Sequence, residues 1–183
     1  MAYVLGCDPG IANFGYALVE LGRAPGDDRL HELGVITTKP SAKKRNVRQN
    51  DDINRRLTEI IADLHEIVRE YRVMLVCTES FSPPRHSGTA AKLGMVFGSL
   101  NTLCLLEDLP LLSVSPQDIK HAVTGSRSAS KADIESVLRK RDADAGRLLD
   151  RVTASKREHP VDAWAAIRSC EHDAVLKMVR RSA

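Results

Sequence analysis

The sequence lacks the features that mark membrane, secreted and zinc-finger proteins. Its apolar stretches all fall short of about 18 residues, so we expect no membrane span. Its amino-terminal apolar stretch is too short and too uncharged for a signal peptide. Its four cysteines (Cys7, Cys77, Cys104 and Cys170) form no CxxC pair, which argues against a zinc site and favours buried, reduced thiols over disulfides. We therefore expect a cytoplasmic protein with no membrane partner.

Low-complexity tracts and a strong net charge are also missing. A chain of 183 residues suits one domain, residues 1–183, and a net charge of +3 says little about partners. The cations are nevertheless clustered, which is typical of a polyanion partner. For any single cation, a solvated helix face or loop is the simpler interpretation. The clusters are Lys43, Lys44, Arg45 and Arg48 in a basic loop (39–51); Lys120, Arg127, Lys131, Arg139, Lys140 and Arg141; and Arg180 and Arg181 in a basic tail (173–183).

Hydrophobic periodicity predicts an α/β fold. Three apolar runs joined by short turns, 3–7, 14–21 and 30–38, indicate an antiparallel meander. Helical spacing follows at 53–71, 90–106, 116–123, 131–140 and about 160–172, with short strands at 73–77 and 111–114. The segment 142–158 gives no clear prediction. This order, β-β-β-α-β-α-β-α-α-α, predicts a five-stranded mixed sheet with helices on both faces.

Acidic residues stand where these predicted elements begin or end. Asp8 ends the first strand, Glu79 ends the fourth, and Asp162 lies in the first turn of the last helix with His159 three residues earlier. If the first and fourth strands are neighbours, Asp8 and Glu79 meet at the carboxyl edge, where open α/β sheets bind ligands. Converging carboxylates repel each other unless a cation such as Mg²⁺ or Mn²⁺ lies between them. Two such ions about 3.5–4 Å apart can activate water and stabilise a leaving 3′-oxygen. The pattern therefore indicates a metal-dependent phosphodiester hydrolase.

Each of these residues also has a simpler interpretation. Asp8 begins an Asp-Pro-Gly turn, Glu79 suits a helix cap or a rim charge, and Asp162 complements a helix macrodipole. His159 precedes a proline, as cap-region histidines do. The prediction therefore depends on the whole set.

Four stretches give the chain a resemblance to the RuvC family of Holliday-junction resolvases, which have the RNase H-like fold. The resemblance runs from Val4 to about Ser169. The most specific feature is that the stretch with Asp-Pro-Gly occurs together with the stretch that carries the two spaced lysines. The stretches are VLGCDPGIANFGYALVE, VMLVCTESF, AAKLGMVFGSLNTLCLLEDLPLLSVSPQDIKHAVTGSRSASK and HPVDAWAAI.

The resemblance implies a homodimer that cuts four-way DNA junctions by paired, symmetric nicks with two Mg²⁺ per active site, for which Mn²⁺ substitutes. The family's catalytic metal ligands correspond to Asp8, Glu79 and Asp162. The fourth ligand, an aspartate in some members and a histidine in others, corresponds to His159. A neutral imidazole leaves the site one negative charge weaker and sensitive to pH near about 6.5. The adjacent Glu158 could compensate for that charge, although its neighbouring helical position would point it elsewhere.

The DNA-contacting lysines of the family correspond to Lys120 and Lys131, and Arg85 and Arg127 are further candidate DNA contacts. The family commonly has an aromatic residue three positions after the second acid, where it stacks on a junction base. Here Phe81 follows Glu79 by two positions, so it is either that wedge or a core residue. Pro83-Pro84 stiffens the loop, and His86 stands where many members have asparagine. These departures predict a relaxed or altered cut-site preference.

The segment 93–106 carries more apolar surface than one sheet face requires. Its Gly94 and Gly98 would let a second backbone approach, so we expect it in the interface of a C₂ dimer that matches the near two-fold symmetry of a junction. Core packing is the alternative. For the activity, two alternatives remain: a related RNase H-like nuclease acting on branched replication DNA or RNA ends, and a junction-binding protein that does not cut.

Overall fold

The computed structural model describes residues 2–42, 46–83 and 85–182, and its strands form one sheet in the order β3-β2-β1-β4-β5. The first three strands pair antiparallel, whereas β1 pairs parallel with β4 and β4 pairs parallel with β5. The predicted five-stranded mixed sheet is therefore confirmed. The strands are β1 (Ala2–Asp8), β2 (Asn13–Leu21), β3 (Arg29–Thr37), β4 (Val73–Glu79) and β5 (Leu111–Val114).

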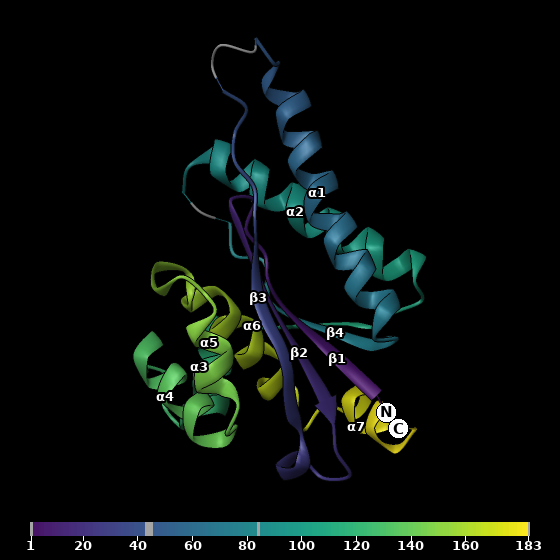
Figure 1. Ribbon diagram of the computed structural model, residues 1–183, viewed down its shortest axis with the longest axis vertical. Helices are drawn as coiled ribbons and strands as arrows, with labels where there is room; N and C mark the ends of the chain where they lie inside the picture. Colours follow the sequence, from purple (N-terminus) through teal and green to yellow (C-terminus); the bar gives the residue numbers. More distant parts are fainter. Residues whose placement is uncertain (1, 43–45, 84, 183) are drawn as a thin grey trace.

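Helices cover both faces of this sheet, with α1 and α2 on one face and α6 at the centre of the other (Figure 1). The smaller helices α3, α4, α5 and α7 contribute to the same core as α6. The helices in the described part of the chain are α1 (Gln49–Glu70), α2 (Ser87–Leu106), α3 (Pro116–Thr124), α4 (Lys131–Arg141), α5 (Ala145–Asp150), α6 (Glu158–Ser169) and α7 (Ala174–Arg181).

The carboxy-terminal part of the chain differs from its prediction. A short helix, α5, lies in the segment 142–158. The last helix, predicted from about 160 to 172 or beyond, ends at Ser169 as α6, and a separate helix, α7, follows it. The Asp173 side chain accepts a hydrogen bond from the Val175 N–H at 2.7 Å and so starts α7 inside the predicted basic tail. Its Arg180 binds the buried carboxylate of Asp28, so reading Arg180 as part of a polyanion footprint was wrong. Lys43, Lys44, Arg45 and Pro84 lie outside the described residues.

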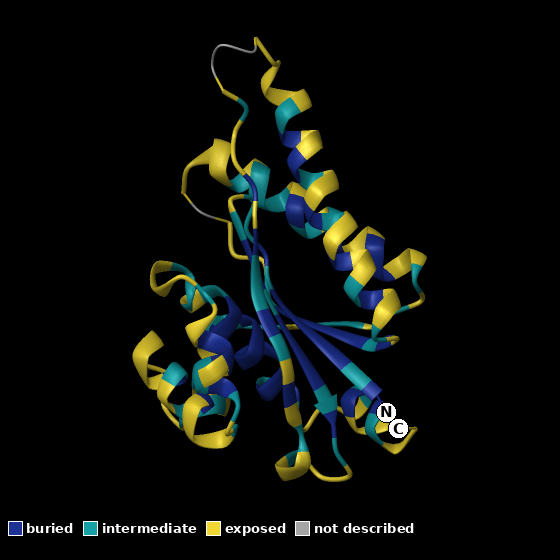
Figure 2. Ribbon diagram, in the orientation of Figure 1, coloured by how far each residue is buried: buried dark blue, intermediate teal, exposed yellow. Residues whose placement is uncertain are grey.

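Strand alternation divides the buried side chains into two cores (Figure 2). Along β1, Val4 packs in the core on the α6 side, whereas Leu5 and Cys7 pack in the core beneath α1 and α2. Helix α1 buries a stripe at helical spacing, including Ile60 and Leu64, against the second core. All four cysteines are buried and free, as expected.

Helix α2 has an unusual amount of exposed apolar surface. Within the described residues, it is the one helix long and apolar enough by composition to cross a membrane, with a mean hydropathy of 1.3. The expectation that no stretch approaches this limit was therefore wrong, because interspersed Gly, Ser and Thr hide a run whose one charge is Lys92. The helix buries Leu100 in the core, yet Leu105 and Leu106 are 76% and 74% exposed. Its apolar residues therefore serve both the core and the surface.

Candidate active site

The first two acidic residues reach the same face of the sheet through strand alternation. Asp8 has the parity of Val4 on β1, and Glu79 has the parity of Leu75 and Cys77 on β4; all three apolar residues pack in the core on the α6 side. The parallel pairing of β1 with β4 continues as far as Cys7 and Thr78, one residue before each acid. This strand register is the reason that Asp8 and Glu79 end neighbouring strands at the same carboxyl edge, as predicted.

Two glycines let α6 approach this face closely. A Cβ on Gly6 would lie 2.0 Å from the Ala163 carbonyl oxygen, and a Cβ on Gly15 would lie 2.4 Å from the His159 carbonyl oxygen. Gly15 is also the residue that pairs with Asp8 across the β1–β2 ladder. The first turn of α6 therefore lies directly over the end of β1, and this approach sets where His159 meets Asp8.

His159 contacts Asp8 directly. Its Nδ1 lies 2.7 Å from Asp8 Oδ2, and both side chains are about one-quarter exposed, at 23% and 25%. The hydrogen bond to Asp8 raises the pKa of His159 above its ordinary value, although burial acts in the opposite direction. The structure thus brings together two of the predicted site residues from opposite ends of the chain.

Asp162 contacts Lys131 rather than His159. Lys131 is the first residue of α4, whose N-cap Ser130 accepts a hydrogen bond from the Asp133 N–H. Its Nζ lies 3.2 Å from Asp162 Oδ2 and 2.5 Å from Glu158 Oε2. Glu158, which was expected to point elsewhere, therefore faces the site through this lysine.

The carboxyl groups at this edge influence one another. Burial raises the pKa of Asp162, and Lys131 opposes that shift. Burial also raises the pKa of Glu79, and the negative charges of Asp8 and Asp162 raise it further. Glu79 is thus a partly buried carboxyl group near two other acids, which makes its ionised form costly unless positive charge lies close by.

The chemistry of these donors suits a hard divalent cation. Carboxylate oxygens, supplemented by one imidazole nitrogen, are ligands that Mg²⁺ and Mn²⁺ accept. Within the described residues, however, no three Asp, Glu, His or Cys side chains close on a single point. Asp8 is instead turned toward His159, and Asp162 toward Lys131. The residues are therefore of the types that bind Mg²⁺ or Mn²⁺, and they lie near one another. Two of the carboxylates, those of Asp8 and Asp162, contact His159 and Lys131.

The candidate DNA-contacting cations are exposed, except for Lys120, which is half-buried. Lys120, on α3, is close enough to Glu79 for its charge to lower the pKa of that carboxyl. Arg127 pairs with Asp118 at 3.2 Å in an exposed salt bridge, and Arg85 is exposed in the loop before α2.

Phe81 is not a core residue. Its side chain is 42% exposed, and its ring packs edge-to-face on Phe97 of α2 with 5.3 Å between centroids. The alternative that Phe81 packs in the core is therefore wrong, and a surface role remains.

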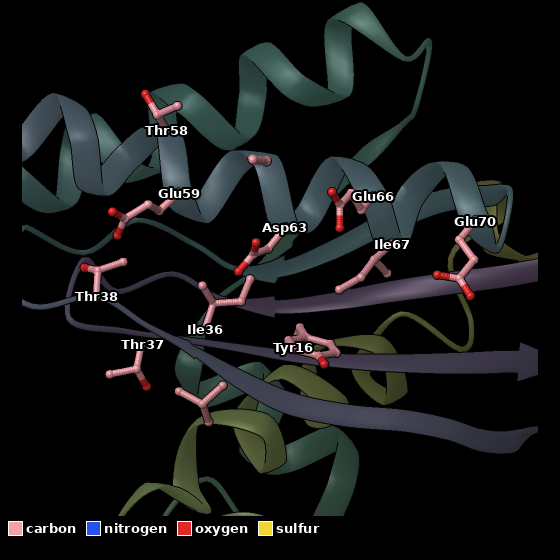
Figure 3. Close-up of a pocket in the computed structure, with 12 residues that line it drawn as sticks. Tyr16, Ile36, Thr37, Thr38, Thr58, Glu59, Asp63, Glu66, Ile67 and Glu70 are labelled. Carbon is pink, nitrogen blue, oxygen red and sulfur yellow. The ribbon is translucent and has the colours of Figure 1, made fainter.

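A separate cavity of about 780 Å³ lies between α1 and the β2–β3 hairpin (Figure 3). Its acidic side chains, Glu59, Asp63, Glu66 and Glu70, all come from α1. The described residues that line it include neither Lys nor Arg, so it repels phosphate, and none of the candidate site residues reaches it. The candidate site residues therefore lie outside this cavity.

Two residues beside the candidate site lie where the sequence did not place them. Gly15 was noted only as an early glycine in a strand, and its place opposite Asp8 depends on the hairpin register. Glu158 lies four residues before Asp162, a spacing that puts both on one helix face, and this signal could have joined it to the site.

Comparison with known proteins assigns the chain to a family. The model of the family described as crossover junction endodeoxyribonuclease RuvC matches residues 4–166. A protein of that name from Halorhodospira halophila is 31% identical, with 91% of this chain and 87% of the relative covered. Another from Synechococcus sp. is also 31% identical, with 77% and 85% covered.

Solved structures agree in fold. RuvC of T. thermophilus in complex with a Holliday junction substrate has a TM-score of 0.75 at 22% identity, with 97% of each chain covered. The yeast mitochondrial Holliday junction resolvase has a TM-score of 0.68 at 16% identity, with 99% of this chain and 82% of that chain covered. The fold is thus RNase H-like, and the family match places the chain in a nuclease class. Within that class, the chain belongs to the RuvC family of crossover junction endodeoxyribonucleases, as its sequence predicted.

Proposed function

We propose that this protein is a structure-selective DNA endonuclease that resolves four-way junctions by paired, symmetric nicks. The single observation that carries the proposal is the contact of His159 with Asp8, because it joins the first strand to the last predicted site helix at the edge where Glu79 ends β4. Membership of the RuvC family supports the junction as substrate, and one relative in fold was solved with a Holliday junction.

We propose Asp8, Glu79, Asp162 and His159 as the residues that hold metal in this family of metal-dependent nucleases, with two Mg²⁺ per active site and Mn²⁺ as a substitute. When bound, such ions supply Lewis acids that polarise the phosphate and lower the pKa of a water nucleophile. The site residues supply the negative charge that retains the ions. His159 contacts Asp8 and orients its carboxylate, and the Lys131 ammonium lies beside Asp162.

The chain's cations then bind and orient the DNA. Lys120 and Lys131 flank the acids, so each would contact a phosphate next to the scissile bond. Arg85 and Arg127 are exposed cations that would add further phosphate contacts. Phe81, exposed in the loop between β4 and α2, would stack on an unpaired base, since an aromatic face binds any base with little sequence preference.

We propose that α2 forms the interface of a homodimer. A mainly apolar groove of about 740 Å³ runs between α1 and α2, lined by Leu57, Ile61, Met95 and Leu106 among others. Gly98 borders the groove, and a Cβ there would meet nothing within 4 Å. Exposed apolar surface of this kind is typical of protein interfaces, and a C₂ dimer would present two matched active sites to a junction. Sedimentation of wild type and Leu106→Glu tests this, and an unchanged monomeric mass for both would refute it.

The decisive experiment compares cleavage of a synthetic four-way junction with cleavage of a matched linear duplex, with and without Mg²⁺, and maps the cuts. We expect Mg²⁺-dependent nicks on opposing strands of the junction alone. Asp8→Asn should abolish cutting and leave junction binding largely intact, because the amide cannot supply the carboxylate charge. Cuts in other branched DNA or in RNA would favour a related nuclease, and binding without cutting would favour a junction-binding protein. An Asp8→Asn variant that cuts normally would refute the catalytic assignment.

A further inference from the structure

Glu158 has no role in the family's ligand set, yet it makes the closest contact of the site's lysine. The Lys131 ammonium lies 2.5 Å from Glu158 Oε2 and 3.2 Å from Asp162 Oδ2. Glu158 and Asp162 lie one turn apart on α6, and Lys131 projects between them from the start of α4. One ammonium group is therefore shared by two carboxylates, of which one belongs to the proposed metal site and the other does not.

We propose that Glu158 is a positioning residue that holds the Lys131 ammonium and so leaves Asp162 able to ligate a divalent cation. This inference rests on the proposed function, because it concerns the cation at that site. An ammonium and a divalent cation on the same carboxylate repel each other. Glu158 gives the ammonium a second anchor, so that it withdraws from Asp162 without leaving the neighbourhood of the scissile phosphate.

The pairing of Glu158 with Lys131 also compensates for the missing negative charge at the fourth ligand position. An imidazole at His159 contributes no negative charge, so the three acids must retain the cations while Lys131 stands beside them. By pairing with Lys131, Glu158 offsets that positive charge and restores the balance at the site. Removing the Glu158 charge should leave Lys131 with Asp162 as its nearest acid and make the cation compete with it.

The test measures cation binding without DNA. The melting temperature of the full chain is followed during a Mn²⁺ titration, because an ion that binds the folded state raises it. We expect Glu158→Gln to raise the half-saturating Mn²⁺ concentration roughly threefold, the scale of a partly exposed ion pair. Lys131→Met should lower it, and Glu158→Gln should add nothing further in the Lys131→Met background.

A matched control is available on the neighbouring helix. Glu135 lines the same cavity of about 290 Å³ as Lys131 and Glu158, but it pairs with Arg139 at 2.8 Å. Glu135→Gln removes the same charge at a similar location and should leave the Mn²⁺ midpoint unchanged.

Any other result of the Mn²⁺ titrations overturns the inference. An unchanged midpoint in Glu158→Gln removes its role, and an equal effect with and without Lys131 means that Glu158 acts only as a distant charge. If Glu158→Gln and Glu135→Gln shift the Mn²⁺ midpoint equally, Glu158 again acts only as a distant charge. The absence of any Mn²⁺ effect on the wild type would overturn the metal site as well. Normal Mn²⁺ binding without junction cleavage would instead refute only the proposed function.

Discussion

Gly15→Ala tests whether the close approach of α6 to the sheet forms the site. A Cβ at Gly15 would lie 2.4 Å from both the carbonyl carbon and the carbonyl oxygen of His159. This is about 1 Å closer than nonbonded atoms of this kind normally approach. The obstructing atoms are backbone, so no rotamer change relieves the clash. The first turn of α6 must therefore move away from the sheet, and the His159 ring moves away from Asp8 with it.

The size of the effect follows from that displacement. Overpacking of this kind costs about 1–3 kcal/mol of unfolding free energy. For a chain of this length, that corresponds to a fall in melting temperature of about 2–12 °C. Misplacing a reacting group by about 1 Å costs on the order of 10²-fold in rate. Cleavage of a junction should therefore fall far more than the folded fraction does at a temperature where the variant is still native.

The assay measures single-turnover junction cleavage and thermal unfolding on the same preparations. Gly26→Ala is the control, because a Cβ at Gly26 would meet nothing within 4 Å, and it should change neither quantity appreciably. If Gly15→Ala cleaves junctions and melts as the wild type does, the close approach of α6 does not determine the geometry of the site, and the prediction is refuted.

Three further changes test other parts of the structure. His159→Asp should retain metal-dependent cleavage and extend it to lower pH, because the raised pKa of His159 means that its imidazolium forms as pH falls and no longer serves as a ligand; complete loss would refute this. Phe81→Ala should reduce cleavage with little change in melting temperature, because the ring is 42% exposed; a fall of many degrees would indicate a structural role. Asp28→Asn should lower stability by about 3–5 kcal/mol in chemical denaturation, because it leaves the buried Arg168 and Arg180 without their shared carboxylate, and a change below about 1 kcal/mol would contradict this.

The sheet was predictable because its pattern is local. Strands such as Leu111–Val114 are short apolar runs, and β1 to β3 are joined by short turns, so both the elements and their pairing follow from adjacent residues. Helix α5 was missed because its stability comes from tertiary contacts. Helix α5 has six residues and no side-chain cap, and it buries Leu148 and Leu149 in a core made by distant segments.

The site was predictable only in part, for the same reason. The ends of strands and helices mark where Asp8, Glu79 and Asp162 lie, but not which partners their side chains choose. Lys131 reaches Glu158 across 27 positions, and His159 reaches Asp8 across 151. Such partners depend on how closely α6 packs against the sheet, and nothing in the local pattern of either segment encodes that distance.

The His159–Asp8 contact explains why a histidine suits this position. If Nδ1 donates its hydrogen to the Asp8 carboxylate, the neutral ring keeps its Nε2 lone pair for a cation or a water proton, as metal-binding histidines commonly do. An aspartate at this position would instead put two negative charges close together, and these repel each other until a cation binds. The histidine therefore orients Asp8 before any cation arrives, whereas an aspartate must rely on the cation for the same alignment. It follows that His159→Asp should melt at a lower temperature than wild type without divalent ions and should gain more stability from Mg²⁺.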